Sequence, residues 1–299
     1  MAISATTNLA LANGVKVPQL GFGVYKSVGD KCFEACKVAL NAGYRHIDSA
    51  QFYENEAEVG QALKQSDVSR KDIFIATKIL VPAGSVEASY KQCVESVKKM
   101  DSESGYVDLF MIHSPSRGHE KIKEMWQALE RLYEEGKAKS IGVSNFGIKH
   151  IEGMKSYAKV WPPHVNQIEV SDRSEQTTST WHDMTDTVKL HPWLQQREIV
   201  EYCKKNNILV EAYCPLVRNQ KADDSTLKGI AEKHNATTNQ ILVRYCLQKG
   251  WSPLPKSETP DRIRSNMEVF GFNLSEDDMK ALDDLDQGAA GAIVQAVDN

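Results

Sequence analysis

The sequence predicts an α/β protein whose strands and helices form a (β/α)8 TIM barrel, preceded by a short N-terminal β-hairpin. Short apolar segments alternate with longer segments of helical periodicity. The apolar segments are continuous, which is typical of parallel strands buried on both faces. The 299 residues, of which 41% are hydrophobic, suit one barrel domain over residues 1–299.

After the hairpin, the predicted strands and helices alternate along the chain, with two helices in succession before the last strand. In the hairpin, residues 9–11 and 15–17 flank Asn13-Gly14, a dipeptide that tolerates positive φ in a tight turn. Apolar runs predict strands at residues 20–24, 46–49, 73–77, 107–112, 140–143, 165–168, 208–213 and 251–254. The periodic segments between and after them predict helices at residues 31–42, 56–65, 86–100, 122–135, 148–157, 197–205, 227–234, 240–248 and 276–285. Alternating strands and helices favour parallel strands joined by right-handed crossovers, and a closed barrel accommodates eight of them.

The main structural alternative is a doubly wound open sheet that binds a dinucleotide. Such a sheet carries Gly-x-Gly-x-x-Gly between its first strand and the following helix. Here Gly21-Phe-Gly23 continues into Val-Tyr-Lys, so the third glycine is missing. The sequence therefore favours the barrel.

Composition excludes several functional classes. The chain has 36 Lys and Arg against 40 Asp and Glu, a net charge of −4, and no long run of one sign. We therefore expect neither a nucleic-acid partner nor a membrane partner. The six cysteines form no Cys-x-x-Cys and no metal-like pattern with histidine, so no metal is expected. The absence of a signal-like or membrane-length apolar stretch predicts a cytoplasmic protein, and we expect a monomer or weak dimer.

Polar residues follow three consecutive predicted strands. Asp48 ends the second strand, Tyr53 comes shortly after it, Lys78 follows the third and His113 follows the fourth. In a barrel of this kind the chemistry lies on the loops after the carboxyl ends of the strands. Each residue alone has an ordinary structural explanation, but together they bring an acid, a phenol, an ammonium and an imidazole to one rim.

These four groups suit the reduction of a carbonyl. A lysine buried at a strand end needs an opposite charge, and Asp48 is the nearest candidate for Lys78. Such a pair favours the ionised form of a neighbouring phenol, while the neutral phenol of Tyr53 can donate a proton. A proton donor beside a histidine that can hold a carbonyl oxygen is a pair of groups that suits the reduction of C=O.

Three long motifs occur in order along the chain: GYRHIDSAQFYENEAEVG at residues 43–60, KSIGVSNF at 139–146 and LPKSETPDRIRSN at 254–266. They resemble the three signatures of the aldo-keto reductases. The resemblance covers essentially the whole chain, and it is to the smaller members, such as the diketogluconate reductases and aldose reductase-like enzymes. It implies a barrel that binds NADPH or NADP+, with NADH less favoured.

The resemblance also implies roles for individual residues. Tyr53 is the general acid and base, Asp48 and Lys78 tune it, and His113 orients the substrate carbonyl. The corresponding cofactor positions are Ser144, Asn145 and Gln167 for the carboxamide, Tyr213 for stacking on the nicotinamide, Leu216 with Cys214, which replaces a common serine, near the pyrophosphate, and Lys256, Ser257, Arg262 and Asn266 at the adenosine end. Two cations and a hydroxyl at the start of a helix suit a 2′-phosphate.

The chain departs from the family in its expected substrate pocket, which Tyr25, His113 and Ser114 line. Tyr25 and Ser114 stand at positions where tryptophan is frequent in the family. Smaller or more polar side chains there leave more room around the substrate. We therefore expect a more open pocket than in the aldose reductases.

The largest departure is an atypical inserted segment at residues 170–189. In the family a single residue separates the Asn-Gln-x-Glu motif from His-Pro. Here residues 170–189 are added between Glu169, which ends the first motif, and Leu190-His191-Pro192. The segment is polar, rich in Thr and Ser, and lacks periodicity. One hypothesis is a functional lid on the catalytic rim, and another is a retained intron. A mature transcript that keeps the segment as its dominant form would contradict the intron hypothesis.

The sequence therefore predicts an NADPH-dependent aldo-keto reductase that converts aldehydes or ketones, sugar-type carbonyls included, to alcohols. One alternative is a diketo-sugar-acid reductase of the same family, which a panel of carbonyl substrates would separate. Another is a cofactor-binding regulatory barrel, or a compromised one, with little turnover. NADPH binding without turnover of any carbonyl would favour this second alternative.

Overall fold

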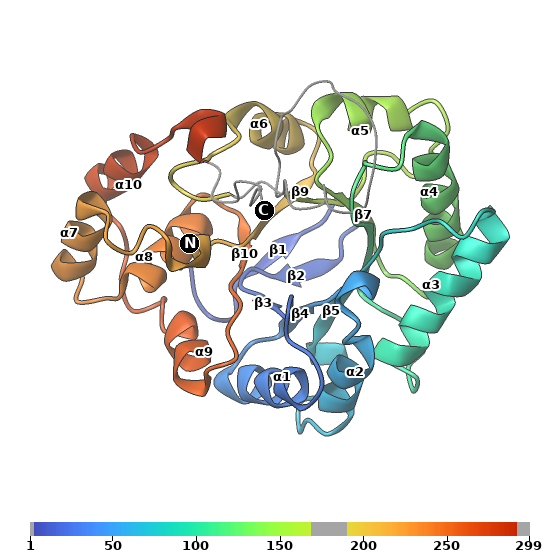
Figure 1. The fold of residues 1–299 in the computed structure, drawn as a ribbon, viewed down its shortest axis with the longest axis horizontal. Helices are drawn as coiled ribbons and strands as arrows, with labels where there is room; N and C mark the ends of the chain where they lie inside the picture. The colour runs from blue at the N-terminus through green and yellow to red at the C-terminus, as the bar shows by residue number, and fades with distance from the viewer. Residues whose placement is uncertain (1–2, 169–189, 292–299) are drawn as a thin grey trace, which may run out of the picture.

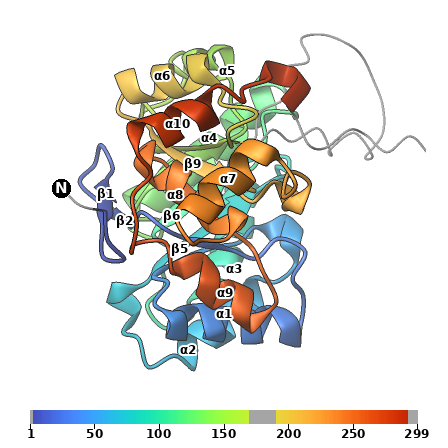
Figure 2. The same cartoon turned by 90° about the vertical axis from the view of Figure 1, so that its left-hand side faces the viewer.

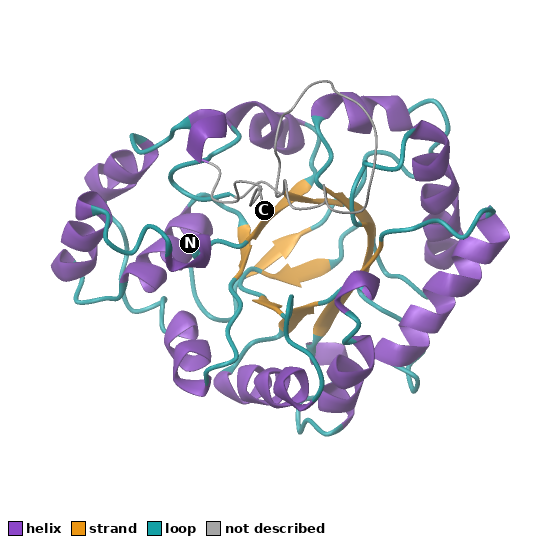
Figure 3. Cartoon of the chain, viewed as in Figure 1, coloured by secondary structure: helices purple, strands orange, loops and turns teal. Residues whose placement is uncertain are grey.

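The computed structural model describes residues 3–168 and 190–291 of the chain. Within them, eight strands form one sheet in the order β10-β9-β8-β7-β6-β5-β4-β3, and neighbouring strands pair in parallel. Figure 1 looks into this sheet, which curves into a ring, and Figure 3 shows the helices as an outer layer around the strands. The predicted (β/α)8 barrel is confirmed.

The strands and helices alternate along the chain as predicted. The strands are β1 Asn8–Ala10, β2 Lys16–Pro18, β3 Phe22–Gly23, β4 His46–Asp48, β5 Phe74–Ile79, β6 Leu109–Ile112, β7 Ile141–Ser144, β8 Val165–Ile168, β9 Leu209–Tyr213 and β10 Ser252–Leu254. The helices are α1 Asp30–Ala42, α2 Glu56–Lys64, α3 Val86–Met100, α4 His119–Glu134, α5 Ile148–Met154, α6 Arg197–Lys205, α7 Ser225–Lys233, α8 Thr238–Gln248, α9 Pro260–Met267 and α10 Glu276–Asp283. Short 3₁₀ turns lie at η1 Gln51–Tyr53, η2 Arg70–Asp72, η4 Val217–Asn219 and η5 Gly288–Gly291.

The barrel closes where β3 meets β10. The Gly21 N–H donates to the Pro253 carbonyl at 3.0 Å, and the Gly23 N–H donates to the Pro255 carbonyl at 3.1 Å. The two segments approach so closely that a Cβ on Gly21 would lie 2.4 Å from Leu254 Cδ2. A side chain at position 21 would therefore press on the buried side chains of Leu254 and His46, and these would have to shift.

The predicted hairpin is also confirmed, and it covers one end of the barrel. Strands β1 and β2 pair antiparallel, with Leu9 opposite Val17, and Gly14 takes a φ of 84° in the turn. Leu11 and Val17 pack on Phe74 and other residues at the amino ends of the barrel strands, in a cluster separate from the main core. Figure 2 shows the hairpin at one end of the barrel. The opposite end, formed by the carboxyl ends of the strands, is not covered by the hairpin.

Element boundaries differ from the predictions by a few residues. The strand predicted at 107–112 begins at Leu109, since Val107 makes only an isolated bridge with Ala138. The helix predicted at 122–135 begins earlier, at His119, because Gly118 takes a φ of 83° and starts it. Helix α9 is not among the ranges predicted from periodicity, but the helix start that the third motif implies is present there, with Pro260 in its first turn.

The inserted segment predicted at residues 170–189 lies outside the described residues, so both hypotheses about it remain predictions. The described chain resumes at Leu190, whose side chain is fully buried. Among the described residues, no helix is both long and apolar enough to cross a membrane.

Candidate active site

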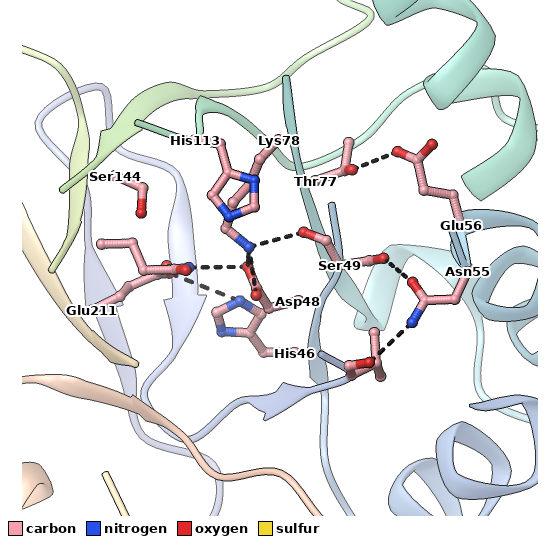
Figure 4. A network of polar contacts seen from close by, with 12 residues as sticks. His46, Asp48, Ser49, Asn55, Glu56, Thr77, Lys78, His113, Ser144 and Glu211 are labelled. Carbon is pink, nitrogen blue, oxygen red and sulfur yellow. Dashed lines mark hydrogen bonds and ion pairs between the residues drawn. The ribbon is translucent and has the colours of Figure 1, made fainter. Parts of the chain in front are cut away.

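Asp48 and Lys78 form an ion pair at the carboxyl ends of β4 and β5. Lys78 Nζ donates to Asp48 Oδ1 at 2.7 Å, to Asp48 Oδ2 at 2.6 Å and to the Ser49 carbonyl at 2.9 Å. Both side chains are completely buried. Figure 4 shows the pair pointing toward each other in the barrel interior. The three ammonium hydrogens are therefore all used, and the predicted partnership of the two residues is confirmed.

Tyr53 and His113 lie beside this ion pair. Tyr53 ends the 3₁₀ turn η1 directly after β4, and its ring centroid lies 5.2 Å from Lys78 Nζ. The rings of Tyr53 and His113 meet edge to face with centroids 5.6 Å apart. The register of β5 and β6 places Ile79 opposite Ile112. Lys78, near the end of β5, and His113, directly after β6, therefore lie at the same rim. The structure thus brings together the four residues that the sequence placed at three strand ends.

The electrostatic environment keeps His113 neutral. Burial, together with the nearby Lys78 ammonium, lowers the pKa of His113 to about 3. At neutral pH the imidazole therefore carries one ring proton and no charge. In this state it can donate one hydrogen bond to a carbonyl oxygen without adding a positive charge next to Lys78.

Three predicted cofactor-binding residues adjoin the same rim. Ser144 ends β7, and Asn145 follows it with a φ of 65°. Asn145 Nδ2 donates to the His113 carbonyl and to Ser144 Oγ, both at 3.0 Å. The Asn145 N–H donates to the carbonyl of Gln167 in β8 at 3.0 Å. These contacts fix the Ser144 hydroxyl and the Asn145 carboxamide next to the main chain of Gln167, and polar groups of this kind suit an amide ligand.

An aromatic side chain completes this part of the rim. Tyr213 ends β9, is half-buried, and meets the ring of Tyr25 with centroids 6.2 Å apart. Tyr25 in turn lies 4.9 Å from the Tyr53 ring. In the loop after β9, Cys214 takes a φ of 55° and is followed by the half-buried Leu216. Tyr213 therefore lies at the same rim as Ser144, with only β8 between their two strands, and its planar ring is available for stacking.

The predicted adenosine-end residues lie after β10 and in α9. Lys256 forms an ion pair with Glu258 at 3.1 Å, and Ser257 Oγ accepts from the Thr259 N–H at 3.1 Å. Arg262, in the first turn of α9, is exposed, whereas Asn266 near its end is buried. The structure therefore places cations and a hydroxyl at the start of a helix, as the sequence predicted.

Of the residues expected to line a substrate pocket, Tyr25 lies beside Tyr53. Tyr25 contributes its ring, and Ser114 follows His113 and accepts through Oγ from the Ser116 N–H at 3.2 Å. The exposed large apolar residues of the described chain are Val28, Phe52 and Val81, which follow β3, β4 and β5. The Phe52 ring, half exposed, lies 6.2 Å from the His113 ring. This side of the rim therefore offers apolar surface to a ligand.

Two buried polar residues next to the site escaped the sequence-based prediction. Glu211 lies in the middle of β9, and His46 begins β4, two residues before Asp48. Both side chains are completely buried and face each other inside the barrel (Figure 4). The sequence does contain a signal for both residues. Side chains two positions apart in a strand point to the same face, so Glu211 shares a face with Tyr213, and His46 shares one with Asp48.

The arrangement can transfer a proton and hold a carbonyl oxygen. Tyr53 supplies a phenol, His113 a neutral N–H, and Asp48 with Lys78 a fixed pair of charges in a dry environment. Within the described residues, no group of three or more His, Cys, Asp or Glu side chains could hold a metal ion.

Sequence comparisons match this chain to known oxidoreductases. The model of the aldo/keto reductase family matches residues 19–287. An uncharacterized oxidoreductase of Schizosaccharomyces pombe is 41% identical over 288 residues, which cover 93% of this chain and 93% of that protein. The glyoxal reductase of Bacillus subtilis is 37% identical over 288 residues, covering 96% of this chain and 95% of the relative.

Solved structures of similar proteins have the same fold. An aldo/keto reductase of Brucella melitensis has a TM-score of 0.84 at 37% sequence identity, covering 96% of this chain and 100% of its own. A mutant of Gox0644 in complex with NADPH has a TM-score of 0.82 at 34% identity, covering 95% of each chain. These structures match both the barrel and its overall extent.

Proposed function

Because this chain belongs to the aldo/keto reductase family, we propose that it is an NADPH-dependent reductase that converts aldehydes or ketones to alcohols. The observation that carries this proposal is the buried Asp48–Lys78 ion pair directly beside Tyr53 and His113. A costly buried charge pair at the rim of a barrel is typical of a catalytic site.

Tyr53 donates the proton in this proposal. When bound, NADPH supplies the hydride that adds to the carbonyl carbon. The oxygen then needs a proton, and the phenol of Tyr53, whose ring centroid lies 5.2 Å from Lys78 Nζ, supplies it. The Lys78 ammonium stabilises the negative charge that Tyr53 acquires as it gives up its proton, and Asp48 keeps that ammonium in place.

His113 orients the substrate. Its neutral ring donates one hydrogen bond to the carbonyl oxygen and so holds that oxygen near the phenol of Tyr53. The low pKa of the imidazole supports a role as hydrogen-bond donor rather than as proton donor, since a cationic ring would form only well below neutral pH.

The donor set around the rim supports a nicotinamide cofactor. Ser144, Asn145 and Gln167 would bind the carboxamide, and Tyr213 would stack on the nicotinamide ring. Cys214 and Leu216 would lie near the pyrophosphate. At the other end Lys256, Ser257, Arg262 and Asn266 would bind the adenosine part, and the two cations favour the 2′-phosphate of NADPH over NADH.

The test is the oxidation of NADPH in the presence of reactive carbonyl compounds. Glyoxal is a reasonable first substrate because a relative is named a glyoxal reductase. Sugar aldehydes, aromatic aldehydes and diketo-sugar acids complete the panel, and they separate a general aldehyde reductase from a sugar-acid reductase. NADPH binding without oxidation across the panel would contradict the proposed activity.

The variant Tyr53→Phe tests the role of the proton donor. We expect kcat to fall by about 100-fold or more, since general acid catalysis contributes about that much. The affinity for NADP+ should remain within about threefold of wild type, because in our proposal the phenol does not bind the cofactor. A variant that keeps full activity would remove Tyr53 from its proposed role.

A further inference from the structure

A chain of buried polar contacts continues from the Asp48–Lys78 pair into the barrel. Gln167 in β8 donates through Nε2 to Asp48 Oδ1 at 3.0 Å and to Glu211 Oε2 at 2.9 Å. Gln167 and Glu211 stand directly opposite each other in the ladder of β8 and β9. The side chains of Asp48, Gln167 and Glu211 are all buried. The carboxamide of Gln167 is thus held between two carboxyl groups.

These contacts determine which way the carboxamide points. One terminal atom of Gln167 contacts both carboxyl groups, and Asp48, which is already paired with the Lys78 ammonium, can only accept a hydrogen bond there. That atom is therefore the nitrogen, and its two hydrogens are both used. The carbonyl oxygen Oε1 of Gln167 is left for another donor.

Glu211 contributes to this arrangement as a neutral acid. Burial, with a smaller contribution from the charge of Asp48, raises the pKa of Glu211 to about 8. Burial also lowers the pKa of His46, whose Nε2 lies 3.8 Å from Glu211 Oε1, to about 4. Both groups are uncharged at neutral pH, and the distance is too long for a hydrogen bond. Because Oε2 accepts from Gln167, the carboxyl proton belongs on Oε1.

We propose that Glu211 is a positioning residue which, together with Asp48, fixes the carboxamide of Gln167 so that its oxygen accepts a hydrogen bond from the nicotinamide carboxamide. This inference rests on the proposed function, because only a nicotinamide cofactor supplies that donor. Without Glu211, one N–H of Gln167 would lose its buried acceptor, and the side chain would turn to satisfy it elsewhere. The neutral state of Glu211 suits the role because a second negative charge would compete with Asp48 for Lys78.

Three variants separate positioning from simple packing. Glu211→Gln keeps an acceptor oxygen in a neutral group of the same shape. Glu211→Leu keeps a similar volume but removes the acceptor. If Glu211→Leu does not fold, Glu211→Thr replaces it, because that shorter side chain cannot reach Gln167. The matched control is Glu56→Gln, which alters another buried carboxyl group that accepts a hydrogen bond from Thr77 at 2.5 Å.

Two measurements are made on the full-length protein. In the cofactor-free protein, NMR follows the exchange of the Gln167 side-chain amide hydrogens with solvent. Separately, quenching of tryptophan fluorescence gives the dissociation constant for NADP+. We expect Glu211→Gln and Glu56→Gln to keep the amide protected and the dissociation constant within about threefold of wild type. Glu211→Leu should expose the amide to exchange and weaken NADP+ binding about tenfold, the loss expected for one misplaced hydrogen bond.

The outcomes distinguish this inference from the proposed function. A folded Glu211→Leu protein with a protected amide and unchanged NADP+ affinity would overturn the positioning role. A loss of affinity in Glu211→Gln equal to that in Glu211→Leu would overturn it as well, because the amide should replace the neutral acid. If the wild-type protein binds no NADP+, the proposed function fails, and amide exchange still decides whether Glu211 fixes Gln167.

Discussion

At the residue scale, the site depends on a charge pair that is expensive to bury. The side chains of Asp48 and Lys78 are completely buried, and their mutual contacts compensate for the lost hydration only while both are present. Asp48 carries a second task because it also accepts from Gln167. The Asp48 carboxylate therefore contacts both Lys78, which lies beside the proposed proton donor Tyr53, and Gln167, which belongs to the proposed cofactor site.

Replacing Asp48 with asparagine should therefore destabilise the protein strongly. We expect Asp48→Asn to lower the free energy of unfolding by about 3–5 kcal/mol, because the Lys78 ammonium remains buried without its counter-charge. Urea denaturation measures the change. The control is Asp284→Asn, which breaks the exposed pair with Lys280 and should change stability little. Equal effects of the two substitutions would show that burial does not determine the importance of the Asp48 pair.

The raised pKa of Glu211 predicts a pH dependence of stability. The unfolded chain ionises this residue near its ordinary value of 4.5, while the folded chain keeps the proton up to about pH 8. Stability therefore falls as the pH rises between these values, because the unfolded state alone releases the proton there. Asp48, Lys78 and His46 are the charged or titratable groups that influence Glu211 or face it.

The variant Glu211→Gln isolates this contribution because glutamine does not titrate. Its free energy of unfolding minus that of wild type should increase as the pH rises from about 5 to about 8, and level off above that. Urea titrations of both proteins across this range provide the comparison. A difference that stays constant over the whole range would mean that Glu211 is already ionised in the fold at pH 5.

At the element scale, short strands and close approaches shape the rim. The strands β3 and β10 have only two and three residues, and backbone contacts from Gly21 and Gly23 join them. A Cβ on Gly21 would also lie 2.8 Å from His46 Nδ1, directly beneath the proposed site. The small size of Gly21 therefore allows the barrel to close and also leaves room for the buried His46 ring.

Adding one methyl group at this seam should be costly. We expect Gly21→Ala to lower the free energy of unfolding by about 1–3 kcal/mol, the usual range for overpacking a tight interior. Gly229→Ala provides the control, because Gly229 lies within α7 with open space around its Cβ position. That variant should gain about 0.5–1 kcal/mol from helix propensity. Thermal and urea unfolding measure both, and a neutral Gly21→Ala would refute a tight seam.

At the scale of the whole molecule, the two ends of the barrel have different tasks. The β1–β2 hairpin covers the amino ends of the strands with an apolar cluster. The carboxyl ends carry Asp48, Lys78, His113, Ser144 and Tyr213. Because parallel strands all point the same way, residues far apart in the sequence meet at one rim. The motif around Lys256 reaches this rim through the last barrel strand.

Cofactor preference is a property of the whole molecule that unfolding experiments can measure. A ligand that binds only the folded state at 100 times its dissociation constant stabilises it by about 2.7 kcal/mol. We expect NADPH to raise the unfolding temperature more than NADH at equal concentration, and Lys256→Ala and Arg262→Ala to narrow that difference. Arg264→Ala is the control, because Arg264 is exposed on α9 and pairs with Asp261 at 3.1 Å. Equal shifts with NADH and NADPH would contradict the proposed 2′-phosphate contacts.

The sequence alone determined the barrel, its hairpin and the candidate tetrad of Asp48, Tyr53, Lys78 and His113. It could do so because buried parallel strands leave continuous apolar runs, and the residue that follows each run marks the rim. Element boundaries were less accurate, since local features such as the positive φ of Gly118 decide where a helix starts.

Only the tertiary structure decided how the side chains partner one another. Glu211 and His46 read as isolated polar residues within strands, and their proximity arises from barrel closure, which brings β4 and β9 face to face across the interior. The direction of the Gln167 carboxamide likewise depends on two carboxyl groups from different strands. Hydrogen bonds and shifted pKa values depend on distance and burial, and a linear sequence encodes these only through the completed fold.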